Sequence, residues 1–151
     1  MYPRRTLRTL NGLIRTCRDG EALCTAWSDA AQTSDLRELL RDRSQEWARQ
    51  ADELQALVLL FDGSPARLGS VGGLLLAVWI GAKTALLGRS DLPVVLDWEL
   101  VQRGALRRYQ QALCEPLPAR VRRTLTLQAS QLSARHHRLE DIRGHFAAHF
   151  H

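Results

Sequence analysis

Residues 6–31 read TLRTLNGLIRTCRDGEALCTAWSDAA, and small or apolar side chains recur along them at intervals of three and four residues. The recurring positions are Leu7, Leu10, Ile14, Cys17, Glu21 and Cys24. That spacing places them on one face of an α-helix. The sequence therefore predicts a long amphipathic helix from about residue 6 to residue 31, with an acidic side chain inside its apolar face.

The same spacing recurs in three further segments, at about residues 35–61, at about 91–115, and from about 118 to past Ile142. Residues typical of caps and turns separate them, namely Ser34, Gly63-Ser64-Pro65 and Pro116. No segment of useful length alternates apolar and polar residues with a period of two, so no sheet is predicted.

The connection between the second and third segments contains an apolar stretch of its own, from about Ser70 to Gly88. As a helix it would span roughly 27 Å at 1.5 Å per residue, about the length of a bundle. The other connections are short and predict antiparallel hairpins, and two hairpins joined by one long crossover have the ferritin-like connectivity. We therefore predict an all-α, ferritin-like four-helix bundle with a short apolar fifth helix. It forms a single domain over residues 1–151, with a core at about 6–143 and a histidine-containing tail at 144–151.

This crossover helix is apolar on nearly every side, so more than one of its faces must be covered. Either it lies in a groove of its own bundle, or its outer face forms a homo-oligomer. The candidate interface residues are Leu76, Trp79, Ile80 and Leu87. A membrane span is not expected, because Lys83 and three glycines interrupt the stretch and it falls short of about 20 apolar residues.

The net charge of +5 comes almost entirely from arginine, since Lys83 is the only lysine. The densest basic run, Arg120-Val121-Arg122-Arg123, is short and has no aromatic side chain nearby, so nucleic-acid binding is not expected. The three cysteines are an odd number without metal-ligand spacing, so they indicate neither a disulfide framework nor a zinc finger. Together with the lack of an apolar leader after the basic N-terminus, these cysteines favour a cytoplasmic location.

Several short motifs occur in a recognisable order along residues 7–143. They are Leu10-Asn11-Gly12-Leu13-Ile14, Asp19-Gly20-Glu21, Gly69-Ser70-Val71-Gly72, Trp79, Lys83, Leu87-Gly88-Arg89-Ser90-Asp91, Glu99, Tyr109 and His136. Together they resemble a bacterial ferritin-like family of unknown function, which implies a small helical bundle with no assigned activity. The chain departs from the family pattern at Cys24, where tyrosine is usual, and at Gln102 and His137, where an acid is usual.

Ionisable and polar side chains occupy apolar positions near the middle of each predicted bundle helix. An unpaired carboxylate in an apolar interior costs several kcal/mol, so these acids need a positive partner. The predicted mid-bundle polar layer consists of Glu21, Glu46, Arg49, Gln50, Glu99, Gln102 and His136.

Two kinds of cation could neutralise this layer. Di-iron bundles use single glutamates on two helices and a Glu-x-x-His pair on each of the other two. In this chain Arg49 occupies the histidine position of one Glu-x-x-His pair, and Ser133 occupies the glutamate position of the other. The di-iron ligand set is therefore incomplete. An internal ion-pair layer involving Arg43 and Arg49 is therefore favoured. The alternative is one iron, manganese or zinc ion held by Glu21, Glu46, Glu99 and His136; no other cofactor is expected.

No Ser-His-Asp set, glycine-rich phosphate loop or Cys-His pair occurs at a useful spacing, so the sequence does not favour an enzyme. His145, His149 and His151 have chelating potential, but their position favours a frayed terminus. The favoured function is a non-catalytic scaffold or interaction module. The alternative is a ferritin-like protein that handles metal or oxidants with a reduced ligand set.

Overall fold

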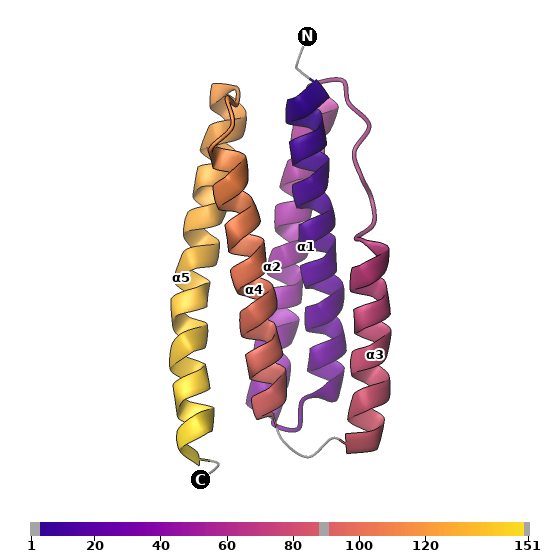
Figure 1. Ribbon diagram of the computed structural model, residues 1–151, viewed down its shortest axis with the longest axis vertical. Helices are drawn as coiled ribbons and strands as arrows, with labels where there is room; N and C mark the ends of the chain where they lie inside the picture. Colours follow the sequence, from indigo (N-terminus) through magenta and orange to yellow (C-terminus); the bar gives the residue numbers. More distant parts are fainter. Residues whose placement is uncertain (1–3, 88–90, 150–151) are drawn as a thin grey trace. The chain divides into compact units, whose positions relative to one another are not determined.

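The computed structural model describes residues 4–87 and 91–149, without the side chains of residues 82–87, 146, 147 and 149. Over these residues the chain forms five α-helices and no strand (Figure 1). They are α1 (Arg4–Ala30), α2 (Ser34–Leu60), α3 (Val71–Leu87), α4 (Leu92–Leu113) and α5 (Ala119–His149). The prediction of an all-α chain with an additional helix in its long connection is confirmed.

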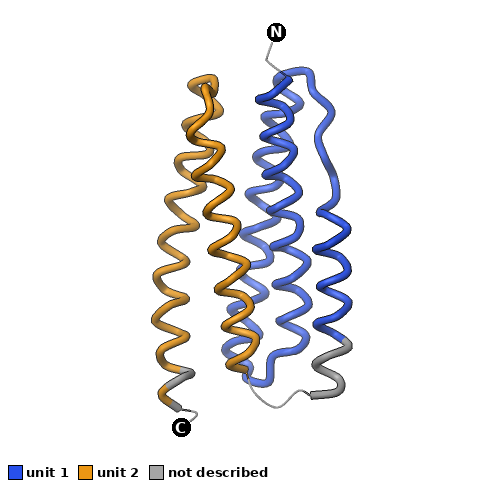
Figure 2. Tube along the Cα trace, in the orientation of Figure 1, with its two compact units in different colours: residues 1–88 blue, residues 89–151 orange. Residues whose placement is uncertain are grey.

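The helices belong to two compact units (Figure 2). The first, residues 1–88, contains α1, α2 and α3, and the second, residues 89–151, contains α4 and α5. Over the described residues, none of these helices has both the length and the apolar character that crossing a membrane requires.

In the first unit, α1 and α2 form a hairpin whose apolar faces pack together. Its core includes Leu10, Ile14, Cys17 and Cys24 from the predicted apolar face of α1, together with Leu40 and Leu54 of α2, all buried. Gly20 sets the approach of the two helices, because a Cβ there would lie 2.6 Å from the ring of Trp47. A larger residue at position 20 would push α1 and α2 apart.

The connection from α2 to α3 runs back beside α1 (Figure 1). Asn11 holds it at two points, donating to the carbonyl of Ser64 at 3.1 Å and accepting from the N–H of Ala66 at 2.8 Å. Gln55 of α2 donates to the carbonyl of Ala66 at 2.9 Å. These contacts bring the chain to the start of α3, which packs on α1.

In the second unit, α4 and α5 form a hairpin closed by residues 114–118. The buried hydroxyl of Tyr109 and Oε1 of Gln128 are 2.7 Å apart, which links the two helices. Arg122 closes the turn by donating to the carbonyls of Leu113 and Glu115, at 2.9 and 2.6 Å. The predicted tail is helical in its described part, since α5 continues to His149.

Candidate functional site

Arg18 provides the positive partner of Glu21. Its guanidinium lies 2.8 Å from Oε2 of Glu21 on α1 and 2.9 Å from Oδ1 of Asp52 on α2, and it donates to Oε1 of Gln55 at 3.2 Å. Burial disfavours the charged guanidinium, but hydrogen bonds to Glu21 and Asp52 and the negative charges of these two residues outweigh that effect and raise the pKa of Arg18. The side chain therefore remains a cation that ties α1 to α2.

Glu46 is neutralised within its own helix. Nη1 of Arg43 lies 3.0 and 2.8 Å from its two carboxylate oxygens. Arg43 is buried and Glu46 half-buried, so this pair lies at the edge of the apolar face. Gln50, one turn further along, is buried, whereas Arg49 lies on the exposed side of α2.

Glu99 is the most deeply buried of the three acids, with 5% of its side chain exposed. Nη2 of Arg103, one turn along α4, lies 2.8 Å from Oε1, and Nε of Arg143 on α5 lies 3.1 Å from Oε2. Two guanidiniums therefore compensate one carboxylate. The spacing of four residues makes Arg103 a foreseeable partner, but no sequence signal points to Arg143.

Gln102 and His136 are both buried in the second unit. Gln102 donates to the carbonyl of Leu132 at 3.4 Å, and Nε2 of His136 lies 3.3 Å from Oε1 of Glu140. Oε1 of Gln102 and Nδ1 of His136 are buried without a hydrogen-bond partner in the described part of the chain. His136 is thus engaged at one nitrogen only.

The structure brings some of the predicted site residues near arginines, but it does not place them all in one cluster. Glu21 and Glu46 belong to the first unit, and Glu99 and His136 to the second. Among the side chains that the structure describes, no three of histidine, cysteine, aspartate and glutamate form a group that could hold a metal. The complete polar layer and the four-residue metal set therefore remain predictions.

The predicted interface helix exposes one apolar face. Val71, Leu74, Leu75, Val78 and Trp79, hereafter the α3 stripe, are between 60% and 75% exposed. Leu76 borders it at 41%, but Ile80 is only 7% exposed. Including Ile80 in an outer interface was wrong. Gly73 lies against Asp19 of α1, and Ile80, seven residues or about two turns further on, shares that face of α3. The side chain of Leu87 lies outside the described residues.

The motif residues Asp19, Gly69 and Ser70 have a structural role at the start of α3. Asp19 of α1 accepts hydrogen bonds from the N–H and the hydroxyl of Ser70, each at 2.7 Å. A Cβ at Gly69 or at Gly73 would collide with the same carboxylate. The sequence predicted no such contact, and a run of glycines after a loop was its only signal.

A family model described as a domain of unknown function (DUF2383) matches residues 5–115. This chain belongs to that family. No curated protein matches the chain. The DUF2383 match includes Asn11, Asp19, Ser70 and the whole α3 stripe, and it ends before α5 begins. Family membership agrees with the unknown function implied by the resemblance.

Proposed function

We propose that this DUF2383 protein is a non-catalytic interaction module that binds a second copy of itself through the α3 stripe. The exposure of the stripe carries the proposal, because five large apolar side chains on one helix face are each at least 60% exposed. Their spacing of three and four residues makes the surface continuous along α3.

Chemically, the stripe differs from an ordinary solvated helix surface. Residues 71–82 contain no charged side chain, whereas the outer side of α2 carries arginines and acids from residue 35 to residue 53. Monomeric soluble proteins rarely expose contiguous apolar patches of more than a few hundred Å². Leu68, in the preceding connection, is also exposed and extends the surface. The stripe therefore has the character of a surface that is covered in the working protein.

A second copy is the partner that this chemistry fits. In a two-fold contact the same patch faces itself, which is unfavourable for a charged patch but not for an uncharged one. Elsewhere two copies with a net charge of +5 repel each other, so the neutral stripe is the favourable place to meet. Its area is on the order of several hundred Å² per copy, comparable with the roughly 800 Å² per partner of a standard interface.

Sedimentation equilibrium over a range of protein concentrations tests this proposal. We expect a reversible dimer, with the tryptophan emission shifting to shorter wavelength as the dimer covers Trp79, the exposed one of the four tryptophans. The double variant Leu75→Glu/Val78→Glu should be monomeric with unchanged helical circular dichroism, because it sets like charges against each other across the contact. The matched control Leu59→Glu/Leu127→Glu changes two other exposed leucines and should still dimerise.

Two results would reject the dimer. One is a wild-type protein that stays monomeric at every concentration and in which Trp79 already emits as a buried indole. The stripe would then be covered within its own chain. The other is a control pair that dissociates as fully as the α3 pair, because any added charge would then have the same effect.

We also propose that the two hairpins associate as a ferritin-like four-helix bundle and form a single domain with a polar layer inside. Two hairpins and one helix-containing connection support this arrangement. The arginine partners of Glu21, Glu46 and Glu99 support an ion-pair layer more than the metal-handling alternative. Urea unfolding should then be a single transition with the same midpoint by circular dichroism and by tryptophan fluorescence. Two separated transitions would contradict a single domain.

A further inference from the structure

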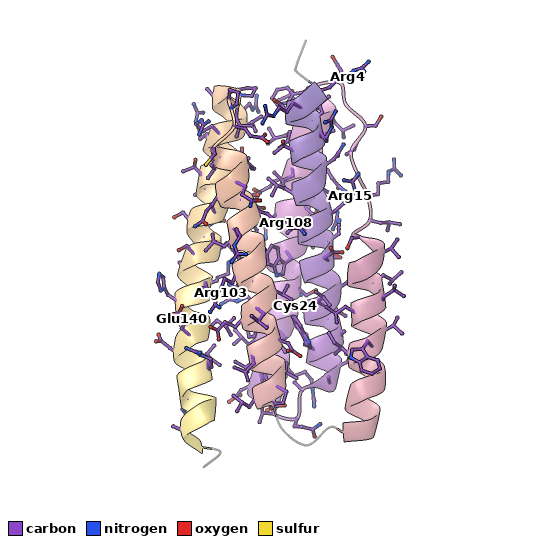
Figure 3. All side chains as sticks on the ribbon, in the orientation of Figure 1. Arg4, Arg15, Cys24, Arg103, Arg108 and Glu140 are labelled. Carbon is purple, nitrogen blue, oxygen red and sulfur yellow. The ribbon has the colours of Figure 1, made fainter. Side chains whose placement is uncertain are left out.

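Arginines gather around the turn of the α4–α5 hairpin. They are Arg107, Arg108, Arg120, Arg122 and Arg123, hereafter the arginine surface, and all five are exposed. Because α4 and α5 pack side by side and residues 114–118 join them, the end of α4 and the start of α5 share one end of this hairpin (Figure 1). Figure 3 labels Arg108 on α4. Residues 100–139 contain a single acidic residue, Glu115.

This surface is larger than the run that the sequence displays. Arg120, Arg122 and Arg123 alone are a short basic segment, and the hairpin adds the Arg107-Arg108 pair of α4 to it. The expectation that nucleic acid does not bind was based on the short run. The hairpin brings guanidiniums of two helices to the same end of the second unit, with Arg122 engaged in closing the turn.

Stability of the hairpin accounts for only part of this surface. Arg122 closes the turn through the carbonyls of Leu113 and Glu115. Over the described residues, Arg107, Arg120 and Arg123 take part in no ion pair. Moreover, α5 has no acidic residue in its first turn, where cations oppose the helix macrodipole. Mutual repulsion among these arginines decreases when an anion binds.

We propose that the arginine surface binds the phosphate backbone of double-stranded nucleic acid without reading its sequence. Guanidinium groups donate two parallel hydrogen bonds to a phosphate, and a duplex presents closely spaced phosphates to several arginines at once. Single strands fit less well, because their bases need exposed aromatic rings to stack on. The aromatic residues of this unit with described side chains are Trp98 and Tyr109, and both are buried. At the turn itself Leu117 is half-buried and Val121 buried, whereas Leu127, one turn after Arg123, is exposed, so a vesicle of anionic phospholipid is the competing surface that the test includes.

Fluorescence anisotropy with a labelled DNA duplex of arbitrary sequence tests the proposal on the full chain. The association constant should fall steeply as salt increases. Arg120→Gln/Arg123→Gln should weaken binding by roughly tenfold or more at low salt and reduce the salt slope by about 2, one for each lost phosphate contact. Arg15→Gln/Arg41→Gln is the matched control, since it removes the same charge from exposed positions of the first unit. It should bind almost as wild type does.

Equal weakening by the two double variants would overturn the proposal, because binding would then follow net charge and not this surface. Binding to vesicles of anionic phospholipid without binding to the duplex would also overturn it. Circular dichroism checks that Arg120→Gln/Arg123→Gln folds, and Arg107→Gln/Arg123→Gln provides a second test if it does not. The proposal is independent of the dimer, so Leu75→Glu/Val78→Glu should still bind the duplex.

Discussion

Asp19 of α1 and Ser70 at the start of α3 are joined by two hydrogen bonds of 2.7 Å, one from the backbone N–H and one from the hydroxyl of Ser70. The Ser70 hydroxyl oxygen in turn accepts a hydrogen bond from the N–H of Gly73 at 3.0 Å. It therefore caps the first turn of α3, and Asp19 places a negative charge where the helix dipole favours one. The contact fixes the start of α3 against α1.

Replacing Asp19 by alanine should loosen α3 selectively. The variant removes two hydrogen bonds to a charged acceptor and the favourable charge at the helix N-terminus, a loss of about 1–2 kcal/mol, while the cap that Ser70 forms on Gly73 remains. Hydrogen exchange followed by mass spectrometry should show faster exchange in peptides from residues 70–81 and unchanged exchange in those from α2. Asp29→Ala, at an exposed position of α1, serves as control. Equal acceleration in α2 would show that Asp19 supports the whole unit and does not act as a local anchor of α3.

Two glycines of α3 should respond to alanine in opposite directions. At Gly73 an added Cβ would collide with the Asp19 carboxylate, whereas at Gly81 it would meet nothing within 4 Å. Gly81→Ala should stabilise the protein by about 0.5–1 kcal/mol, because alanine is the better helix former. Gly73→Ala should destabilise it, and thermal unfolding of both variants measures the difference. If the two variants change stability in the same direction, α3 does not approach Asp19 as closely as the structure shows.

Helix positions were largely predictable from the sequence. Long stretches with spacings of three and four residues identify α1, α2, α4 and α5 to within a few residues at most ends, because burial on one face imposes that period directly. Cys17 and Cys24 were expected as small seam residues and are buried. The sequence predicted that the last helix runs past Ile142, but it gave no end point, and α5 continues to His149.

The contacts of the polar residues were much less predictable. Arg103 follows Glu99 by one turn, but Arg143 reaches the same carboxylate only because α4 and α5 pair. The orientation of α3 was unpredictable for another reason. When nearly every position of a helix is apolar, periodicity does not distinguish Ile80, which is buried, from Trp79, which is exposed. Chain packing decides both cases, and a single sequence does not show it.

Substituting glutamine for Glu99 should destabilise the protein moderately. Glutamine keeps the shape but loses charge-assisted hydrogen bonds to Arg103 and Arg143. Both arginines are about half exposed, so water can solvate them afterwards and the expected loss is about 1–2 kcal/mol. Urea unfolding measures it, with Asp97→Asn at an exposed position of α4 as control. A loss no larger than that of the control would mean that the pairing contributes little to stability.

Metal should be substoichiometric in protein prepared without chelator and without metal-affinity purification. Glu21, Glu46 and Glu99 already have guanidinium partners, so binding a cation would require breaking those pairs. Elemental analysis for iron, manganese and zinc measures the content, and EDTA should leave the thermal midpoint unchanged. A variant with alanine at His145, His149 and His151 separates chelation by the C-terminal histidines from binding elsewhere. One equivalent of metal that persists in this variant and disappears with Glu99→Gln would overturn the ion-pair interpretation, because Glu99 would then serve as a ligand and not as the partner of two arginines.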